Sequence, residues 1–307
     1  MSTSGYEHIL EELRYQCDLP NEERIAIICR RSYVPHPRAV EIITATKALI
    51  KHPDRDFARC LAAIGPPGFG KSAILDRLEA LYPKPTTPPA GVRQLPLLRV
   101  NVPGDVDIGT LACRILRELD EPHNAADRPN ALLEDAFTAL SDAGVLVLML
   151  DEFHNLFLAK PQLSKMMAVV RDIPNTLKLG LVCAGTQDAE NCIIADAQLE
   201  ERFDRFHLEP WTATQEFRNF VGSLESRLPL CRPSHLTGSE LLPLLLRVSE
   251  GRMNRLVWTI RYAACAAVSD KSEGIREAHI RAAALKIISA RRKVGREDML
   301  EKELAGA

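Results

Sequence analysis

The sequence lacks the features that mark membrane, secreted and zinc-binding proteins. No apolar run approaches the ~18 residues of a membrane-spanning helix, and residues 1–7 contain neither the basic nor the apolar region of a signal peptide. The 8 cysteines form no C-x-x-C pair, and several lie within apolar strand or helix patterns. We therefore expect reduced core thiols, no membrane segment and a cytoplasmic location.

An excess of basic residues, which would mark a basic nucleic-acid-binding domain, is also absent. The 39 Lys and Arg residues face 41 Asp and Glu residues, so the net charge is −2. Any contact with nucleic acid must therefore come from a local basic surface. With 307 residues, 46% of them hydrophobic, the chain can bury a full core and suits one α/β domain plus a smaller one.

A phosphate-binding pattern stands out against this ordinary composition. The fixed positions of G-x-x-x-x-G-K-[ST] are all matched by Gly65-Pro66-Pro67-Gly68-Phe69-Gly70-Lys71-Ser72, directly after the apolar run 60–64. Such a match is expected by chance in only ~1% of chains of this length. The alternative, a glycine turn without a ligand, is weakened further by the helical spacing of apolar residues after the loop.

Each residue type in this loop has a chemical role in binding a polyphosphate. Glycines let the backbone fold its N–H groups around a polyphosphate, and the helix that opens at Ala73 directs its positive end at the anion. Lys71 would reach the β- and γ-phosphates, and Ser72 would give its hydroxyl to Mg²⁺. The sequence thus predicts that residues 65–73 bind ATP.

A second nucleotide signal is an apolar run that ends in two acids. Residues 145–150 are all apolar, and Asp151 and Glu152 follow them. This pattern predicts a buried parallel strand with Asp151 in the Mg²⁺ shell and Glu152 polarising a water toward the γ-phosphate. Without the phosphate loop, a buried strand that ends in solvated acids would be an equally good interpretation.

Strand and helix patterns alternate from about 57 to 210, which predicts a parallel sheet covered by helices. After Trp211 only helical patterns remain. We expect an N-terminal helical extension (1–56), an α/β core (57–211), a helical lid (212–293) and a C-terminal tail (294–307). Within the core, strands are expected at 60–64, 95–100, 145–150, 178–184 and 206–208, and helices at 72–82, 109–119, 129–142 and 162–172.

Together these motifs resemble the AAA+ ATPases, and three further segments extend the likeness. The run 181–186 is similar to the sensor-1 strand, which implies that Thr186 bonds the attacking water or the γ-phosphate; a helix cap is the alternative. Either Arg202 or Arg205 stands where the family keeps its arginine finger, although a surface ion pair would suit each one singly. In the sensor-2 segment 251–256, Asn254 replaces the arginine of many relatives and Arg255 follows it.

Several segments narrow the likeness within this class: Glu22-Glu23-Arg24-Ile25, Tyr33-Val34-Pro35-His36-Pro37-Arg38-Ala39, Gly65–Ser72, Leu148–Leu156 with its D-E-x-H ending, Gly185-Thr186-Gln187-Asp188-Ala189 and Leu208-Glu209-Pro210-Trp211. Through these segments the chain most resembles the transposon target-selection ATPases TniB and TnsC, with IstB and MuB more distant. The likeness spans residues 22 to 256. It implies that Val34, Pro35 and Arg38 lie near the adenine and phosphate, with a proline-capped helix start as the alternative.

The resemblance implies a Mg²⁺-dependent ATPase that forms rings or filaments on duplex DNA and presents it to a separate DDE-type transposase, with a TniQ-like adaptor as a possible further partner. Non-specific contacts to DNA phosphates would come from the loops 101–110 and 124–130, where Arg99, Thr110 and Arg128 are the candidates. The alternative is an AAA+ ATPase that remodels or scaffolds protein complexes without binding DNA. The absence of an aromatic residue from 103–109 disfavours it.

Overall fold

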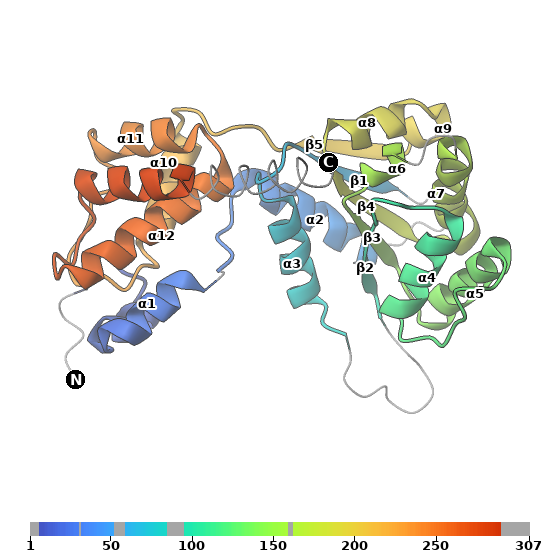
Figure 1. Cartoon of the computed structure of the whole chain (residues 1–307), viewed down its shortest axis with the longest axis horizontal. Coiled ribbons are helices and arrows are strands. Elements are labelled where there is room, and N and C mark those ends of the chain that lie inside the picture. Colours follow the sequence, from blue (N-terminus) through green and yellow to red (C-terminus); the bar gives the residue numbers. More distant parts are fainter. Residues whose placement is uncertain (1–5, 31, 52–58, 85–94, 159–161, 290–307) are drawn as a thin grey trace, which may run out of the picture. The chain divides into compact units, whose positions relative to one another are not determined.

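The computed structural model describes residues 6–30, 32–51, 59–84, 95–158 and 162–289. The chain forms two compact units (Figure 1). One unit comprises residues 37–209, and the other joins the residues up to His36 with those from Pro210 onward. Among the residues described, no helix is both long enough and apolar enough to span a membrane.

The 37–209 unit is built on five parallel strands in the order β2-β3-β4-β1-β5. The predicted parallel sheet is therefore confirmed. Its central strands are buried on both faces, as expected for continuous apolar runs. The strands are β1 (Cys60–Ile64), β2 (Leu97–Asn101), β3 (Val147–Asp151), β4 (Gly180–Gly185) and β5 (Phe203–His207).

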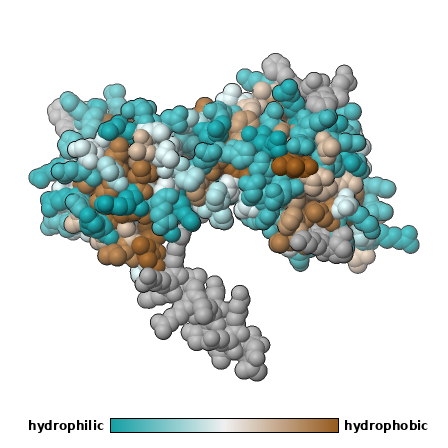
Figure 2. All heavy atoms as spheres, turned by 90° about the horizontal axis from the view of Figure 1, so that it is seen from above, coloured by the Kyte–Doolittle hydropathy of each residue, from teal (hydrophilic) through white to brown (hydrophobic). Residues whose placement is uncertain are grey.

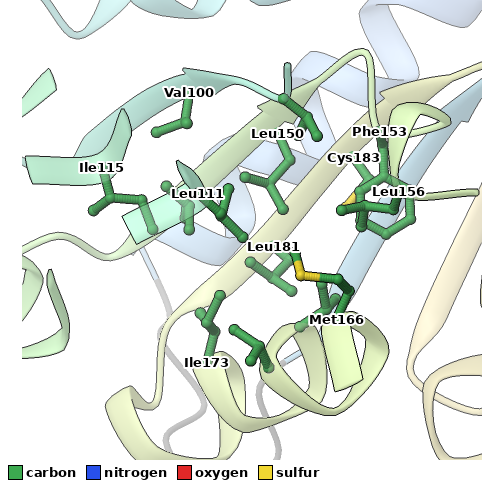
Figure 3. Close-up of a cluster of buried hydrophobic side chains, with 14 of the residues drawn as sticks. Val100, Leu111, Ile115, Leu150, Phe153, Leu156, Met166, Ile173, Leu181 and Cys183 are labelled. Atoms are coloured by element: carbon green, nitrogen blue, oxygen red, sulfur yellow. The ribbon is translucent and has the colours of Figure 1, made fainter. Parts of the chain in front are cut away.

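Helices cover both faces of this sheet. Helices α2 (Pro37–Lys51) and α3 (Lys71–Leu81) contact each other and the strands β3 and β4. On the other face, strand residues such as Leu150 and Leu181 share one hydrophobic cluster with the remaining helices (Figure 3). Those helices are α4 (Ile108–Glu118), α5 (Pro129–Asp142), α6 (Asn155–Leu158), α7 (Leu163–Leu177), α8 (Gln187–Ile194) and α9 (Ala197–Glu200).

The other unit has its own hydrophobic core. Ile28 and Val34 from the N-terminal part lie in one cluster with Phe217, Phe220 and Leu256 from the C-terminal part. Its elements are a 3₁₀ helix (Glu11–Asp18), α1 (Asn21–Cys29), α10 (Gln215–Glu225), α11 (Leu241–Ser249), α12 (Met253–Ser269) and helical residues at 277–289. Figure 2 shows that hydrophilic residues cover most of the visible surface of each unit, with smaller hydrophobic areas among the hydrophilic residues.

This division differs from the expected extension over residues 1–56. Residues up to His36 complete the core of the helical unit, whereas α2 belongs to the sheet unit. The physical reason is that α1 packs against α12 and cannot bury its apolar residues alone. The predicted tail at 294–307 lies outside the described residues.

A buried arginine ties α1 to the C-terminal part of its unit. Arg24 is only 3% exposed. Its Nε and Nη2 donate to the carbonyl oxygen of Pro229 at 3.0 and 2.8 Å, and its guanidinium pairs with the carboxylate of Glu273. Burial penalises the charged form of Arg24, but the Glu273 hydrogen bond is the larger influence and raises its pKa.

Replacing Arg24 by alanine is expected to lower the free energy of unfolding of this unit by roughly 3 kcal/mol, because it leaves the Glu273 carboxylate without its main partner. Urea denaturation followed by tryptophan fluorescence measures this unit selectively, since the only 2 tryptophans, Trp211 and Trp258, both belong to it. The exposed Arg30 of the same segment provides the control, Arg30→Ala. Equal effects of the two substitutions would contradict the expectation.

Candidate active site

The phosphate loop connects β1 directly to α3 in a compact turn. Gly68 and Gly70 have φ angles of 84° and 94°, in the left-handed region that favours glycine. At Gly65 a Cβ atom would lie 2.8 Å from the carbonyl oxygen of Leu208, so the loop can begin beside the end of β5 only because this residue has no side chain. These three glycines thus serve the loop geometry that the sequence predicts.

Lys71, the first residue of α3, is held inside this loop. Its side chain is buried, and Nζ donates to the carbonyl oxygens of Gly65 at 2.6 Å and Pro66 at 3.0 Å. Burial lowers the pKa of Lys71, while the nearby charges of Glu152 and Asp151 act in the opposite direction. A buried ammonium that is bonded to two neutral carbonyls is well placed to exchange them for phosphate oxygens.

The two acids after β3 have different environments. Asp151 is 4% exposed, and its Oδ1 accepts the N–H of Glu152 at 2.9 Å. The side chain of Glu152 is 44% exposed, and its backbone has a φ of 55°, which is uncommon for a residue with a side chain. A turn holds this backbone, because the N–H of Asn155 donates to Glu152 at 2.8 Å and the N–H of Phe153 donates to Ala184 at 2.9 Å.

His154 lies beside the Glu152 carboxylate. Its Nε2 is 3.3 Å from Oε2 of Glu152, while its Nδ1 is buried and has no hydrogen-bond partner in the part of the chain that the structure describes. The next residue, Asn155, donates from Nδ2 to the carbonyl oxygen of Val102 at 2.7 Å and so ties this turn to the end of β2. The D-E-x-H pattern gives the spacing of these residues, but only the tight turn explains why the histidine faces the acid.

Thr186 lies at the carboxyl end of β4, the strand between β1 and β3. It occupies the N-cap position of α8, yet its side chain makes no capping hydrogen bond. The alternative interpretation of Thr186 as a helix cap therefore has no support from the hydrogen bonding. Because neighbouring parallel strands end at one edge of the sheet, Thr186 stands between the phosphate loop and the acids after β3.

Arg99, predicted as a DNA contact, is paired with three carboxylates. Its guanidinium lies 2.6 Å from Asp76, 2.8 Å from Glu79 and 2.5 Å from Asp151. A DNA phosphate would have to displace these acids from a side chain that is only 18% exposed. Arg99 is therefore a poor candidate for a DNA contact, and its partners place it beside Asp151 and two acids of α3 instead.

The other two candidate DNA contacts differ in their surroundings. Thr110 donates from both its amide and its hydroxyl to Oδ1 of Asp107, at 2.7 and 2.8 Å, as part of the N-terminal cap of α4. An adjacent carboxylate disfavours a phosphate there. Arg128 is exposed at the N-cap position of α5, where its cationic group is accessible from solvent.

Both candidate arginine fingers lie at the edge strand β5. Arg202 directly precedes the strand, and its carbonyl oxygen accepts the N–H of Cys60 at 3.0 Å. Arg205 is within the strand, 3.9 Å from Glu190 and 3.8 Å from Glu200. The long contacts of Arg205 leave it compatible with a role toward a second subunit.

The remaining predicted nucleotide contacts fall into both units. Val34 is 7% exposed within the core of the helical unit, whereas Arg38 belongs to the sheet unit and pairs with Glu41 at 2.5 Å. Pro35 is exposed and belongs to the helical unit.

Arg255, at the start of α12, pairs with Glu250 at 2.5 Å. Oδ1 of Asn254 and Nε of Arg255 are buried and have no hydrogen-bond partner among the described residues, so both side chains retain unused bonding capacity there.

The parallel sheet and the loop, acids and threonine at its edge define a P-loop ATPase of the AAA+ class. Similar folds include the Aeropyrum pernix ORC2 protein in ADPNP–ADP complexes (TM-score 0.60, 16% identity, 85% of this chain and 71% of that chain). The A. pernix ORC1 protein in complex with DNA has a TM-score of 0.61 and 18% identity over 86% of this chain and 69% of that chain. For Cdc6p from Pyrobaculum aerophilum the values are 0.59 and 20%, over 84% and 69%.

A match to a family sequence model shows the family to which this chain belongs. The model described as "Bacterial TniB protein" matches residues 24–213, which is more than half of the 307-residue chain. The chain therefore belongs to the TniB family. A comparison with curated proteins gave no match.

Proposed function

We propose that this protein is a Mg²⁺-dependent ATPase that assembles on duplex DNA and presents the DNA to a separate transposase. The observation that carries the ATPase part is the convergence of three strand ends. The phosphate loop follows β1, Thr186 follows β4 and the pair Asp151–Glu152 follows β3, and these strands are neighbours in the sheet.

The donor groups at the proposed metal position suit Mg²⁺, which prefers oxygen ligands and usually keeps several waters. Ser72 presents a hydroxyl on the exposed side of the first turn of α3, and Asp151 contributes a buried carboxylate. Bound there, Mg²⁺ would neutralise charge on the β- and γ-phosphates. Lys71 would supply the matching positive charge from the protein side.

Glu152 is the residue proposed to orient the attacking water. Its exposed carboxylate can accept a proton from water, while the fixed backbone of the turn keeps it near the strand edge. Thr186 would hold the same water or a γ-phosphate oxygen through its hydroxyl. Val34, Pro35, Arg38, Asn254 and Arg255 remain proposed neighbours of the nucleotide, with the last two using their unpartnered atoms.

Assembly is proposed to complete the site through a neighbouring copy of the chain. An arginine finger is positioned by one subunit at the γ-phosphate bound to another. Arg202 and Arg205 are the candidates because both lie at the edge strand of the sheet rather than at its centre. A ring or a filament would satisfy this requirement, since both repeat one head-to-tail contact.

DNA association is supported by the family and by the printed descriptions of similar structures. One is the A. pernix ORC1 protein in complex with DNA, and another is Drosophila ORC bound to DNA (TM-score 0.56, 18% identity). In this chain the exposed Arg128 is the candidate phosphate contact that remains. Backbone amides of the loop 101–110 could position a sugar-phosphate chain with little net charge. A DDE-type transposase and a TniQ-like adaptor are the proposed protein partners.

Electron microscopy of the full chain with duplex DNA tests this proposal. We expect rings or filaments on DNA in the presence of a non-hydrolysable ATP analogue, and none without it. The assemblies should disappear between low and moderate salt, because phosphate contacts release counterions. Rings that form equally with and without DNA would contradict the DNA-binding role and would favour a protein-remodelling ATPase instead.

A further inference from the structure

Arg99 is a largely buried cation between the proposed metal-site carboxylate and two acids of α3. Its Nη1 lies 2.6 Å from Oδ1 of Asp76 and 2.8 Å from Oε2 of Glu79, whereas Nη2 bonds Oδ2 of Asp151 at 2.5 Å. The side chains of Asp76 and Glu79 are 48% and 43% exposed. One nitrogen of Arg99 is thus anchored on α3 while the other holds Asp151.

Rigid elements create this arrangement. In the register of β2 and β3, Asn101 pairs with Asp151 and Arg99 pairs with Met149. Since alternate strand residues share a face, Arg99 and Asp151 are diagonal neighbours on the face that α3 covers. Asp76 and Glu79 are three residues apart and therefore lie on one side of α3.

At the proposed metal position, the positive charge of Arg99 acts against the negative charge of the Asp151 carboxylate. Oδ1 of Asp151 accepts the Glu152 amide and Oδ2 accepts Arg99, so each oxygen already has a partner. Burial opposes the charged form of Arg99, but hydrogen bonds to the three acids outweigh it and place its pKa above the ordinary value. A permanent positive charge beside a metal ligand repels a divalent cation.

We propose that Arg99 is a positioning residue that serves as an internal counter-ion: it holds Asp151 in place and lowers the affinity of the nucleotide site for Mg²⁺. Asp76 and Glu79 have the opposite effect, because they add negative charge and compete with Asp151 for the same guanidinium. This inference rests on the proposed Mg²⁺-dependent nucleotide binding. It predicts that substitutions on the two sides of the cluster change the Mg²⁺ requirement in opposite directions.

A purely structural role makes a different prediction. If Arg99 only braced α3 against β3, then removing either the arginine or its α3 partners would loosen the site. All such variants would then need more Mg²⁺. The sign of the change therefore separates the two roles.

The test is a Mg²⁺ titration of the binding of a fluorescent ADP analogue to the full chain. Arg99→Gln is expected to lower the half-saturating Mg²⁺ concentration about 3- to 10-fold, and the double variant Asp76→Asn/Glu79→Gln to raise it about 3-fold. The double variant Glu134→Gln/Asp135→Asn is the matched control. Like the α3 double variant, it removes two negative charges, but from the exposed side of α5, and it should leave the Mg²⁺ requirement unchanged.

The directions of the two shifts together test the inference. A shift in the same direction for both variants, or no shift, overturns the inference. If Arg99→Gln fails to fold, as judged by circular dichroism, the double variant can still overturn the inference, because Asp76 and Glu79 are exposed: an unchanged or lowered Mg²⁺ requirement contradicts the counter-ion role. Absence of Mg²⁺-dependent binding in the wild type would instead remove the proposed function on which the inference rests.

Discussion

Replacing Lys71 by alanine is expected to weaken ATP and ADP binding by about 100-fold or more, which corresponds to about 3 kcal/mol for the loss of a buried charge that meets the phosphates. The structure gives the reason. Nζ is fixed within the loop by the carbonyl oxygens of Gly65 and Pro66, so its charge is already positioned before a nucleotide arrives. Isothermal titration calorimetry with ADP and with a non-hydrolysable ATP analogue measures the effect.

The matched control is Lys165→Ala, which removes an exposed lysine from α7. It should bind nucleotide like the wild type. Thermal unfolding without ligand shows whether Lys71→Ala keeps its fold, since the substitution also leaves two loop carbonyl oxygens without a donor. A folded Lys71→Ala protein that binds within a few-fold of the wild type would refute the assignment of this loop as the phosphate site.

The parts of the molecule that follow from short sequence patterns were predictable. The central strands are continuous apolar runs, and the phosphate loop is a local motif whose geometry its own glycines dictate. The sequence predicts the edge strand β5 at 206–208, whereas the structure has it at Phe203–His207. The first residues of the strand are missed because most of its side chains are exposed and give little apolar signal.

Contacts between distant residues could not be predicted. Arg24 and Glu273 are 249 positions apart, so no local pattern shows that the N-terminal residues complete the helical unit. Arg99 lies 52 positions from Asp151, and only the pairing of β2 with β3 brings them together. From the sequence, Arg99 is simply a cation near a predicted loop, which is why a DNA contact was the expected role.

Substituting glutamine for Glu152 is expected to lower the rate of ATP hydrolysis by about 100-fold or more, the usual contribution of a general base. Nucleotide affinity should stay within about 3-fold, because a residue that acts on the water contributes little to ground-state binding. Glutamine has nearly the same shape as glutamate and similar backbone preferences, so it can adopt the φ of 55° and the turn should persist. Steady-state phosphate release and ADP binding, measured on the same preparation, test both expectations, with Glu134→Gln on α5 as the control.

The contrast between the two substitutions is itself informative. Lys71→Ala should prevent the assembly on DNA because the nucleotide-bound state never forms. Glu152→Gln should instead make the assembly persist in ATP, since that state forms but is not consumed. If Glu152→Gln hydrolyses ATP normally, the water must be oriented by another group at the strand edge, and Thr186, whose hydroxyl makes no capping bond, is the next residue to substitute. If hydrolysis stops but the assembly is no more persistent than in the wild type, then turnover does not control disassembly.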